Sequence, residues 1–133
     1  MRPLATLCVA AASLVACAGA ASETTPETSL TITTRATETA EPVVRTLRCE
    51  PAGGTLMSPV RACARLAALE KPFAPTPRNV FCTEIYGGPQ KARVTGSYRG
   101  RRIWASFARR NGCEIERWNR HVFLFPAVGA TGS

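Results

Sequence analysis

Alternating apolar and polar positions predict about five short strands along the chain. Residues 30–33 alternate strictly, and residues 43–49 form a second candidate after a loop rich in Thr, Glu and Pro. Residues 91–98 alternate small apolar with polar side chains, and the pattern resumes at residues 103–107 after an Arg-Gly-Arg turn. These two segments indicate an antiparallel hairpin with one packed and one solvated face. The apolar run at residues 122–125 is the fifth candidate strand.

One segment has helical spacing instead. Ser58 followed by Pro59 is typical of an N-cap and the first helical position. The apolar side of the predicted helix, residues 59–69, carries Val60, Cys63, Leu66, Ala67 and Leu69. Three prolines within residues 71–77 exclude more helix there. The pattern predicts an α+β fold, with a small antiparallel sheet of about five strands and one main helix packed on it.

Between the helix and the hairpin lies a segment with neither pattern. Residues 80–86 are rich in apolar and β-prone side chains and are predicted to be extended. The Gly-Gly-Pro sequence at residues 87–89 ends this segment.

The beginning of the chain has the features of an export signal. Arg2 precedes an uncharged apolar run that ends near residue 16 and is too short to span a bilayer stably. Residues 14–17 (Leu-Val-Ala-Cys) resemble a lipobox, which would make Cys17 the lipidated first residue, while residues 18–20 (Ala-Gly-Ala) offer a competing cleavage site. We expect a protein outside the cytoplasm, secreted or lipid-anchored to the cell surface. The expected parts are a signal peptide (1–16), a flexible tether (17–28), a folded domain (29–126) and a disordered tail (127–133).

Export changes the meaning of the cysteines. Six are present in 133 residues, and two of them lie in the apolar leader. The folded body keeps Cys49, Cys63, Cys82 and Cys113. An exported domain of this size uses such cysteines as disulfides, so we expect two, and sequence alone leaves three pairings open.

Positive charge is concentrated in the second half of the chain. Residues 91–120 hold nine basic residues against two glutamates, within a chain whose formal net charge is +8. Such a concentration fits an acidic partner or nucleic acid. A solvated sheet face that keeps an exported protein soluble explains it better, so no nucleic acid is expected.

Catalytic and metal-binding patterns are missing from the sequence. His121 is the one histidine, and the body cysteines have the spacing of disulfides, without a Cys-x-x-Cys pair. A nucleophile with a neighbouring base would have to use His121, which we expect at the surface or at a strand edge. We therefore predict that the protein is not an enzyme and uses no metal or cofactor.

Five segments of the sequence form a recognisable combination. They are residues 47–51 (Leu-Arg-Cys-Glu-Pro), 62–63 (Ala-Cys), 80–89 (Val-Phe-Cys-Thr-Glu-Ile-Tyr-Gly-Gly-Pro), 111–114 (Asn-Gly-Cys-Glu) and 122–125 (Val-Phe-Leu-Phe). In their order, their cysteine spacing and the Arg-Gly-Arg-Arg turn, they resemble the Streptomyces subtilisin inhibitor family of proteinaceous serine protease inhibitors. The resemblance runs from about Ser29 to Phe125, nearly the whole predicted domain.

The resemblance implies a pairing and a site. The disulfides would be Cys49–Cys63 and Cys82–Cys113. The partner would be a secreted serine protease, which takes up an extended segment as it would a substrate. The bond presented to the enzyme would be Glu84–Ile85, within a loop that also contains Phe81, Cys82, Thr83 and Tyr86. Asn111 matches a family residue that supports this loop from behind by a hydrogen bond. Family members also form dimers through their sheets, and we expect the same here.

Two side chains of this loop set the expected target. Phe81, the fourth residue counted back from the bond, suits an apolar pocket of subtilisin-like enzymes, although pattern alone fits a core position equally well. Glu84 departs from the Met, Lys, Arg or Leu usual in the family. A carboxylate loses hydration in an apolar pocket and is repelled by the Asp of a trypsin-type pocket. We therefore expect weak inhibition of trypsin-like and chymotrypsin-like enzymes, and a broad subtilisin or a glutamate-preferring protease as the target.

Two other functions remain open. A non-inhibitory surface lipoprotein of the same fold would explain Glu84 as a sign that the loop has lost its task. A polyanion-binding module would use the Arg-rich hairpin, with Tyr98, Trp104 and Trp118 as stacking surfaces. Trp104 falls on the face opposite Ile103, so we expect it to be exposed or at an interface.

Overall fold

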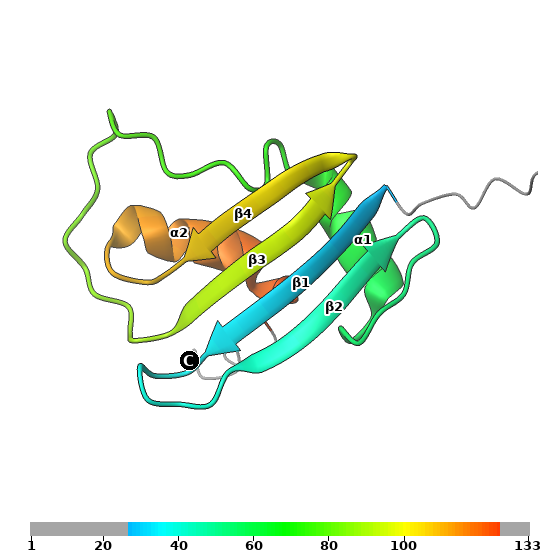
Figure 1. Ribbon diagram of the computed structural model, residues 1–133. Helices are drawn as coiled ribbons and strands as arrows, with labels where there is room; N and C mark the ends of the chain where they lie inside the picture. The colour runs from blue at the N-terminus through cyan, green and yellow to red at the C-terminus, as the bar shows by residue number, and fades with distance from the viewer. Residues whose placement is uncertain (1–26, 126–133) are drawn as a thin grey trace, which may run out of the picture.

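Four antiparallel strands form one sheet in the order β2-β1-β3-β4, and both helices lie against the same face of it (Figure 1). The computed structural model describes residues 27–125. The strands are β1 (Thr28–Arg35), β2 (Val43–Cys49), β3 (Lys91–Tyr98) and β4 (Arg101–Phe107). The helices are α1 (Pro59–Ala68) and α2 (Gly112–His121), and a single 3₁₀ turn, η1 (Val122–Leu124), follows. The α+β fold is confirmed, with four strands where about five were predicted.

The core lies between the sheet and the helices. One set of alternate strand residues faces the helices and is buried: Leu30, Ile32, Leu47, Ala92, Val94, Ala105 and Phe107. From the other layer come Ala62 and Leu66 of α1, Trp118 of α2, and Leu124 and Phe125 beyond it. Their burial is the main stabilising contribution, because apolar area removed from water contributes about 25 cal/mol per Å².

The predicted fifth strand is wrong. Residues 122–124 form η1, which turns the chain so that Leu124 and Phe125 enter the core. The Phe125 ring lies 4.7 Å from the Trp118 ring and 5.2 Å from the Phe107 ring, centroid to centroid. A run of four apolar residues fits a buried strand and a buried turn equally well, so the pattern did not distinguish them.

Helix α2 was not predicted, and it changes the place of two residues. Trp118 is 2% exposed, so it is a core residue and not a stacking surface. His121, expected at the surface, is 3% exposed. Both side chains lie on the face of α2 that meets the sheet, where burial of Trp118 anchors the helix.

Helix α1 begins at Pro59 as predicted and ends one residue earlier, at Ala68. Its buried side consists of Ala62 and Leu66, while Val60 is 72% exposed. Ser58 is the N-cap, as predicted, but its backbone is left-handed and its side chain makes no capping hydrogen bond. Ala62 N–H instead donates to the Ser58 carbonyl, 3.0 Å away.

Both disulfides are present in the pairing that the resemblance implies. Cys49–Cys63 joins the end of β2 to α1, and Cys82–Cys113 joins the segment between α1 and β3 to α2. The leader, most of the tether with Cys17, and the tail after Phe125 lie outside the described residues. Strand β1 begins at Thr28, within the expected tether.

Candidate functional site

A long connection between α1 and β3, residues 69–90, contains neither helix nor strand. In Figure 1 it is drawn in green to yellow-green and passes along the outside of α2 before it enters β3. The middle of this connection, residues 81–87, is called the exposed loop below. It contains all the residues that the sequence assigned to the reactive bond and its neighbours.

The side chains of the exposed loop project into solvent. Phe81 is 97% exposed, Tyr86 68% and Ile85 61%, and Glu84 is also exposed. The alternative that Phe81 is a core residue is therefore wrong. Three large apolar side chains exposed within six residues lower solubility, and such a patch marks a contact surface.

The first half of the exposed loop is fastened to α2. The disulfide Cys82–Cys113 holds its start at the first turn of that helix. One residue further on, Gly112 N–H donates to the Thr83 carbonyl at 2.8 Å. A Cβ on Gly112 would lie 2.1 Å from Thr83 Oγ1, so a larger residue there would force the Thr83 side chain to move.

The second half is fastened just before α2. Gly87 N–H donates to the Arg109 carbonyl at 2.6 Å. A Cβ on Gly87 would lie 2.7 Å from Ile115 Cγ1 and 3.1 Å from the Arg109 carbonyl oxygen, so the backbone here is pressed against the helix. Arg109 also donates from Nη1 to Gln90 Oε1 at 3.3 Å, which holds the chain as it leaves the loop.

Both halves are thus tied to one short stretch, residues 109–113, called the clamp segment below. Within residues 27–125, no hydrogen bond reaches Glu84, Ile85 or Tyr86. The Glu84–Ile85 peptide is therefore free for an outside partner, while the chain on each side of it is held. This arrangement presents an extended segment with little conformational entropy left to lose on binding.

Asn111 lies in the clamp segment and its side chain caps α2. Its Oδ1 accepts a hydrogen bond from Glu114 N–H at 3.0 Å, and its backbone is extended, as an N-cap requires. The hydrogen bond to the loop comes from the next residue, Gly112. Support of the loop by Asn111 remains a proposal. The hydrogen bond from Glu114 N–H to Asn111 Oδ1 would give this support indirectly, by fixing the first turn of α2, which carries Gly112 and Cys113.

Sequence reasoning missed four contributors to this site. They act through backbone groups or through close packing, which produce no recognisable sequence motif, and they are Gly87, Arg109, Gly112 and Ile115. One signal was available, because Asn111 followed three residues later by Glu114 is a typical start of a helix. Recognising it would have placed Cys113 and Gly112 on a helix directly behind the loop.

His121 holds the far end of α2 against the connection that leads to the loop. Its Nδ1 lies 2.7 Å from the Arg117 carbonyl oxygen and its Nε2 lies 2.6 Å from the Pro72 carbonyl oxygen. Burial lowers the pKa of His121, the two carbonyl contacts oppose that shift, and the positive charges of Arg117 and Arg120 add to it. In the unfolded chain the pKa of a histidine is about 6.5.

We expect the free energy of unfolding to fall as pH falls below about 6.5, because the unfolded chain then binds a proton that the folded protein resists. This loss continues down to the lowered pKa of the folded state, and above about 6.5 the stability is fully present. Urea unfolding between pH 7.5 and 5.5 measures it. His121→Gln, which removes the one histidine of the chain, should flatten the profile. Equal slopes for the two proteins would contradict the assignment.

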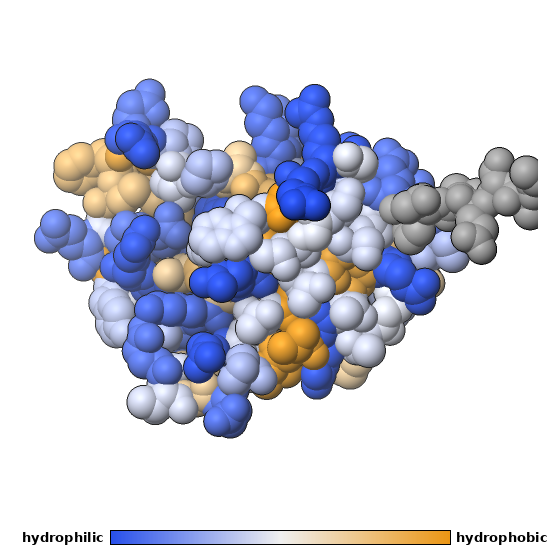
Figure 2. Space-filling view, in the orientation of Figure 1, coloured by the Kyte–Doolittle hydropathy of each residue, from blue (hydrophilic) through white to orange (hydrophobic). Residues whose placement is uncertain are grey.

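The sheet has one uncovered face, seen in front in Figures 1 and 2. Hydrophilic side chains spread over this face, and the apolar patches on it are small (Figure 2). Its basic residues are Arg35, Arg48, Lys91, Arg93 and Arg102, with Trp104, 66% exposed, among hydroxyl side chains. The Arg93 guanidinium lies 5.1 Å from the centre of the Trp104 ring.

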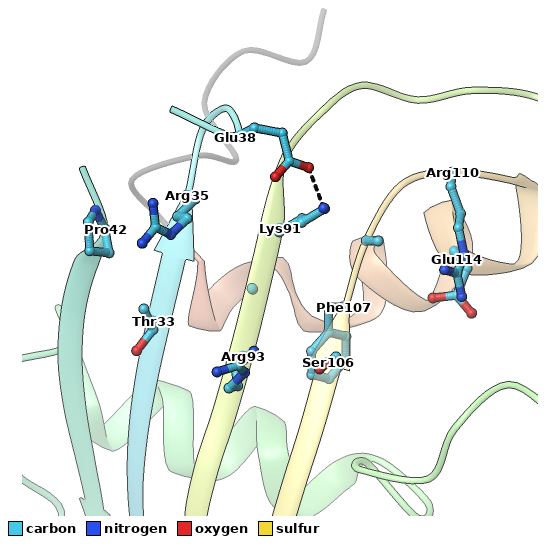
Figure 3. Close-up of a pocket in the computed structure, with 12 residues that line it drawn as sticks. Thr33, Arg35, Glu38, Pro42, Lys91, Arg93, Ser106, Phe107, Arg110 and Glu114 are labelled. Carbon is cyan, nitrogen blue, oxygen red and sulfur yellow. Dashed lines mark hydrogen bonds and ion pairs between the residues drawn. The ribbon is translucent and has the colours of Figure 1, made fainter. Parts of the chain in front are cut away.

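At one end of this open face is a depression of about 510 Å³. Arg35, Lys91, Arg93 and Arg110 line it, and Glu38 pairs with Lys91 (Figure 3). Glu114 also lines the depression, but its carboxylate is bound by Thr76. Three guanidinium groups therefore face this depression without an acidic partner among the described residues.

Neither a metal site nor a membrane span is found in residues 27–125. No group of three or more His, Cys, Asp or Glu side chains in this range is placed to hold a metal ion. No helix in it is long and apolar enough to cross a membrane.

Comparison with known proteins adds three findings. A family model described as subtilisin inhibitor-like matches residues 11–111. Subtilisin inhibitor-like protein 1 of Streptomyces cacaoi is 38% identical over 85 residues, which cover 60% of this chain and 76% of that protein. The crystal structure of Streptomyces caespitosus sermetstatin in complex with Bacillus licheniformis subtilisin is similar with a TM-score of 0.44 and 20% identity, over 78% of this chain and 97% of that one.

Proposed function

This chain belongs to the subtilisin inhibitor-like family, and from that premise we propose that it inhibits a subtilisin-type serine protease outside the cytoplasm. The bond offered to the enzyme is Glu84–Ile85. The observation that carries the proposal is the free peptide between two fastened halves of one loop. Membership in a family of inhibitors also fits a protein that is not an enzyme.

The geometry supports a substrate-like mode of binding. The enzyme's nucleophile would attack the Glu84 carbonyl, and the Ile85 amine would be the leaving group. Because Gly87 remains bonded to Arg109, the amine stays beside the acyl group, and reformation of the peptide competes with hydrolysis. Thr83 and Cys82 hold the acyl side in the same way. A complex that neither dissociates nor turns over quickly is an inhibited enzyme.

The exposed side chains support a choice of target. Phe81 and Tyr86 are free to enter enzyme pockets on either side of the bond. Glu84 would carry a charge into the primary pocket, which disfavours a trypsin-like enzyme and an apolar pocket alike. We propose a glutamate-preferring protease, or a broad subtilisin in which the remaining loop contacts supply the affinity.

Mapping the cut tests the proposed bond. The protein is incubated with a catalytic amount of a subtilisin, and the masses of the products are measured by mass spectrometry before and after reduction of the disulfides. We expect a single addition of one water with no loss of mass, because the disulfide Cys82–Cys113 joins the two pieces. Reduction should then release pieces that end at Glu84 and begin at Ile85. A first cut at any other bond would contradict the proposal.

Gly112→Ala is expected to weaken inhibition by about 10-fold or more, because its Cβ would displace Thr83 and cost the bond to its carbonyl. Gly53→Ala is the matched control, since its Cβ would meet only the end of the flexible Arg48 side chain, far from the loop. Inhibition constants of both variants for one subtilisin measure the effect. Equal constants would show that the Thr83 contact does not matter.

The open face supports a second activity or an assembly. We propose, as the family resemblance implies, that two copies pair through their sheets around Trp104. The unpaired arginines of the same face instead favour a polyanion as the alternative partner. Salt separates the two, because added salt screens repulsion between two basic faces and strengthens pairing, whereas it weakens polyanion binding steeply. Sedimentation at low and moderate salt, with and without heparin, gives the answer.

Export and anchoring also remain proposals. A signal peptide over residues 1–16, lipid on Cys17 and a tether to residue 28 would place the domain at the cell surface. Cleavage after Ala20 would release it instead. Mass spectrometry of the mature N-terminus distinguishes the two forms. A surface-anchored protein that inhibits no protease would support the non-inhibitory lipoprotein.

A further inference from the structure

Side chains on one face of α2 contact the connection that leads into the exposed loop. Glu114, Arg117 and His121 follow one another at spacings of three and four residues, so their side chains lie along one side of the helix. Each contacts a different residue of the connection. Thr76 Oγ1 donates to Glu114 Oε1 at 2.7 Å, Arg117 Nε donates to the Ala74 carbonyl at 3.1 Å, and His121 Nε2 lies 2.6 Å from the Pro72 carbonyl oxygen.

The three contacts form a regular ladder. Successive rungs use every second residue of the connection, which runs antiparallel to α2. Residues 71–74 form a turn, in which Ala74 N–H donates to the Lys71 carbonyl at 3.1 Å, so the stretch from Pro72 to Thr76 is not fully extended. The seven residue steps from Glu114 to His121 span about 10 Å of helix, and the turn shortens the connection below the roughly 13 Å that four extended steps would cover.

Proline explains why the connection depends on these side chains. Pro72, Pro75 and Pro77 have no N–H group, so the connection cannot join a sheet ladder, yet its carbonyl groups still require donors. Arg117 meets that requirement at the Ala74 carbonyl, and His121 meets it at the Pro72 carbonyl in the tautomer that carries its proton on Nε2. Arg117 is 5% exposed, donates also from Nη1 to the Ser106 carbonyl at 2.5 Å, and lies 3.9 Å above the Phe107 ring centre. It therefore fixes the connection to β4 as well as to α2.

Residues 77–81 lead from the ladder to the disulfide at Cys82. A depression of about 540 Å³ lies between the connection and α2, and its lining includes ladder residues as well as Pro77, Val80 and Phe81. Phe81 lines its rim and is 97% exposed, and Val80 is 44% exposed. The hydrophobic effect favours folding these side chains down onto α2. A contact must therefore keep residues 77–81 from packing onto α2, and the ladder lies immediately before them in the chain.

We propose that Glu114, Arg117 and His121 are positioning residues that hold the entry to the exposed loop, so that Phe81 is presented to the protease. This inference rests on the proposed function and adds to it a second support, separate from the clamp segment. The ladder sets the direction from which the chain approaches Cys82, while the clamp segment fixes the bond itself.

Thr76→Val tests the ladder with the smallest change, because it removes one donor and keeps the shape of the side chain. We expect the inhibition constant for a subtilisin to rise by about 3- to 10-fold, because the loss of one hydrogen bond changes a binding constant by about this factor. Thr55→Val is the matched control. Thr55 Oγ1 accepts from Thr46 N–H at 2.9 Å beside β2, on a part of the chain that does not contact the exposed loop.

Two substitutions at Glu114 supply the rescue. Glu114→Gln keeps an oxygen that can accept from Thr76, so inhibition should stay near that of the natural protein. Glu114→Ala removes it and should weaken inhibition as Thr76→Val does, and the double variant Thr76→Val with Glu114→Ala should be no weaker than either single change. Additive losses in the double variant would contradict a shared contact.

A second readout does not depend on inhibition. Arg78 is exposed between the ladder and the disulfide, so trypsin can cut after it when the stretch loosens. We expect Thr76→Val to be cut there about 3- to 10-fold faster than Thr55→Val at a temperature where both are folded, because cutting follows the open population. Equal rates would overturn the ladder. If the natural protein inhibits no protease, the proposed function fails, and the trypsin comparison alone still decides on the ladder.

Discussion

Glu84→Lys is expected to make the protein a trypsin inhibitor, with an inhibition constant lower by at least about 100-fold, which corresponds to about 2.7 kcal/mol. The substitution replaces repulsion between two carboxylates by attraction between an ammonium group and the Asp of the trypsin pocket. Residues 84–86 make no hydrogen bond with the described residues, so the change leaves the fold intact. Titration of trypsin with both proteins measures the gain.

Glu41→Lys is the matched control for this change. It alters the net charge equally, at an exposed position of the connection between β1 and β2, outside the exposed loop. A gain shared by both variants would reflect overall attraction and not the primary pocket. Glu84→Met should in parallel tighten binding to a subtilisin, because an apolar side chain enters its pocket without losing the hydration of a carboxylate. If neither Glu84 variant changes any inhibition constant, the assigned bond is wrong.

Removal of the disulfide Cys82–Cys113, by Ser at both positions, is expected to convert the inhibitor into a substrate. Within the cut loop, the acyl side would then be held only by the hydrogen bond from Gly112 to Thr83, and the new end at Glu84 would move away before the peptide reforms. We expect hydrolysis at Glu84–Ile85 to accelerate by at least about 100-fold, since proximity is worth several kcal/mol in such a reaction.

The disulfide Cys49–Cys63 provides the control for stability. From the loss of chain entropy in the unfolded state, Cys82–Cys113, with a sequence separation of 31 residues, stabilises the folded state by about 3.7 kcal/mol. Cys49–Cys63, with a separation of 14 residues, stabilises it by about 3.0 kcal/mol. The Cys49→Ser, Cys63→Ser pair therefore loses nearly as much stability but leaves the loop fastened. Its inhibition constant should stay near the natural value where it is folded. Equal hydrolysis of both variants would mean that the second disulfide acts only through stability.

The strands were predictable because their pattern repeats over enough residues. Lys91–Tyr98 coincides with the predicted segment, since Ala92 and Val94 are buried between polar positions. Val43–Cys49 also coincides, although only Leu47 is buried there and Val43 and Cys49 are half-buried. Helix α2 was missed because only Trp118, between Arg117 and Asn119, gives its buried side a large apolar residue. Its other buried residues are Arg117 and His121, which a search for apolar periodicity cannot find. They are buried because carbonyl groups of the connection and of β4 bind them.

The position of the exposed loop was predicted by family resemblance, and its large exposed side chains agree with that position. The resemblance also implied the disulfide Cys82–Cys113 that fastens it, but the hydrogen bonds that fasten it were not predictable. The bonds from Gly112 to Thr83 and from Gly87 to Arg109 join backbone groups, so no residue type announces them. The ladder is a similar case, because Pro72 and Ala74 contribute only carbonyl oxygens. Contacts of this kind appear only when the distant segments are placed together.

The inhibitor function is tested most directly by a titration of residual enzyme activity with the purified protein, for a subtilisin, a glutamyl endopeptidase and trypsin in parallel. We expect a linear, stoichiometric loss of activity for the subtilisin or the glutamyl endopeptidase, slow cleavage at Glu84–Ile85, and little effect on trypsin. Full activity of all three enzymes at excess protein, with both disulfides intact, would contradict it and leave a non-inhibitory member of the family.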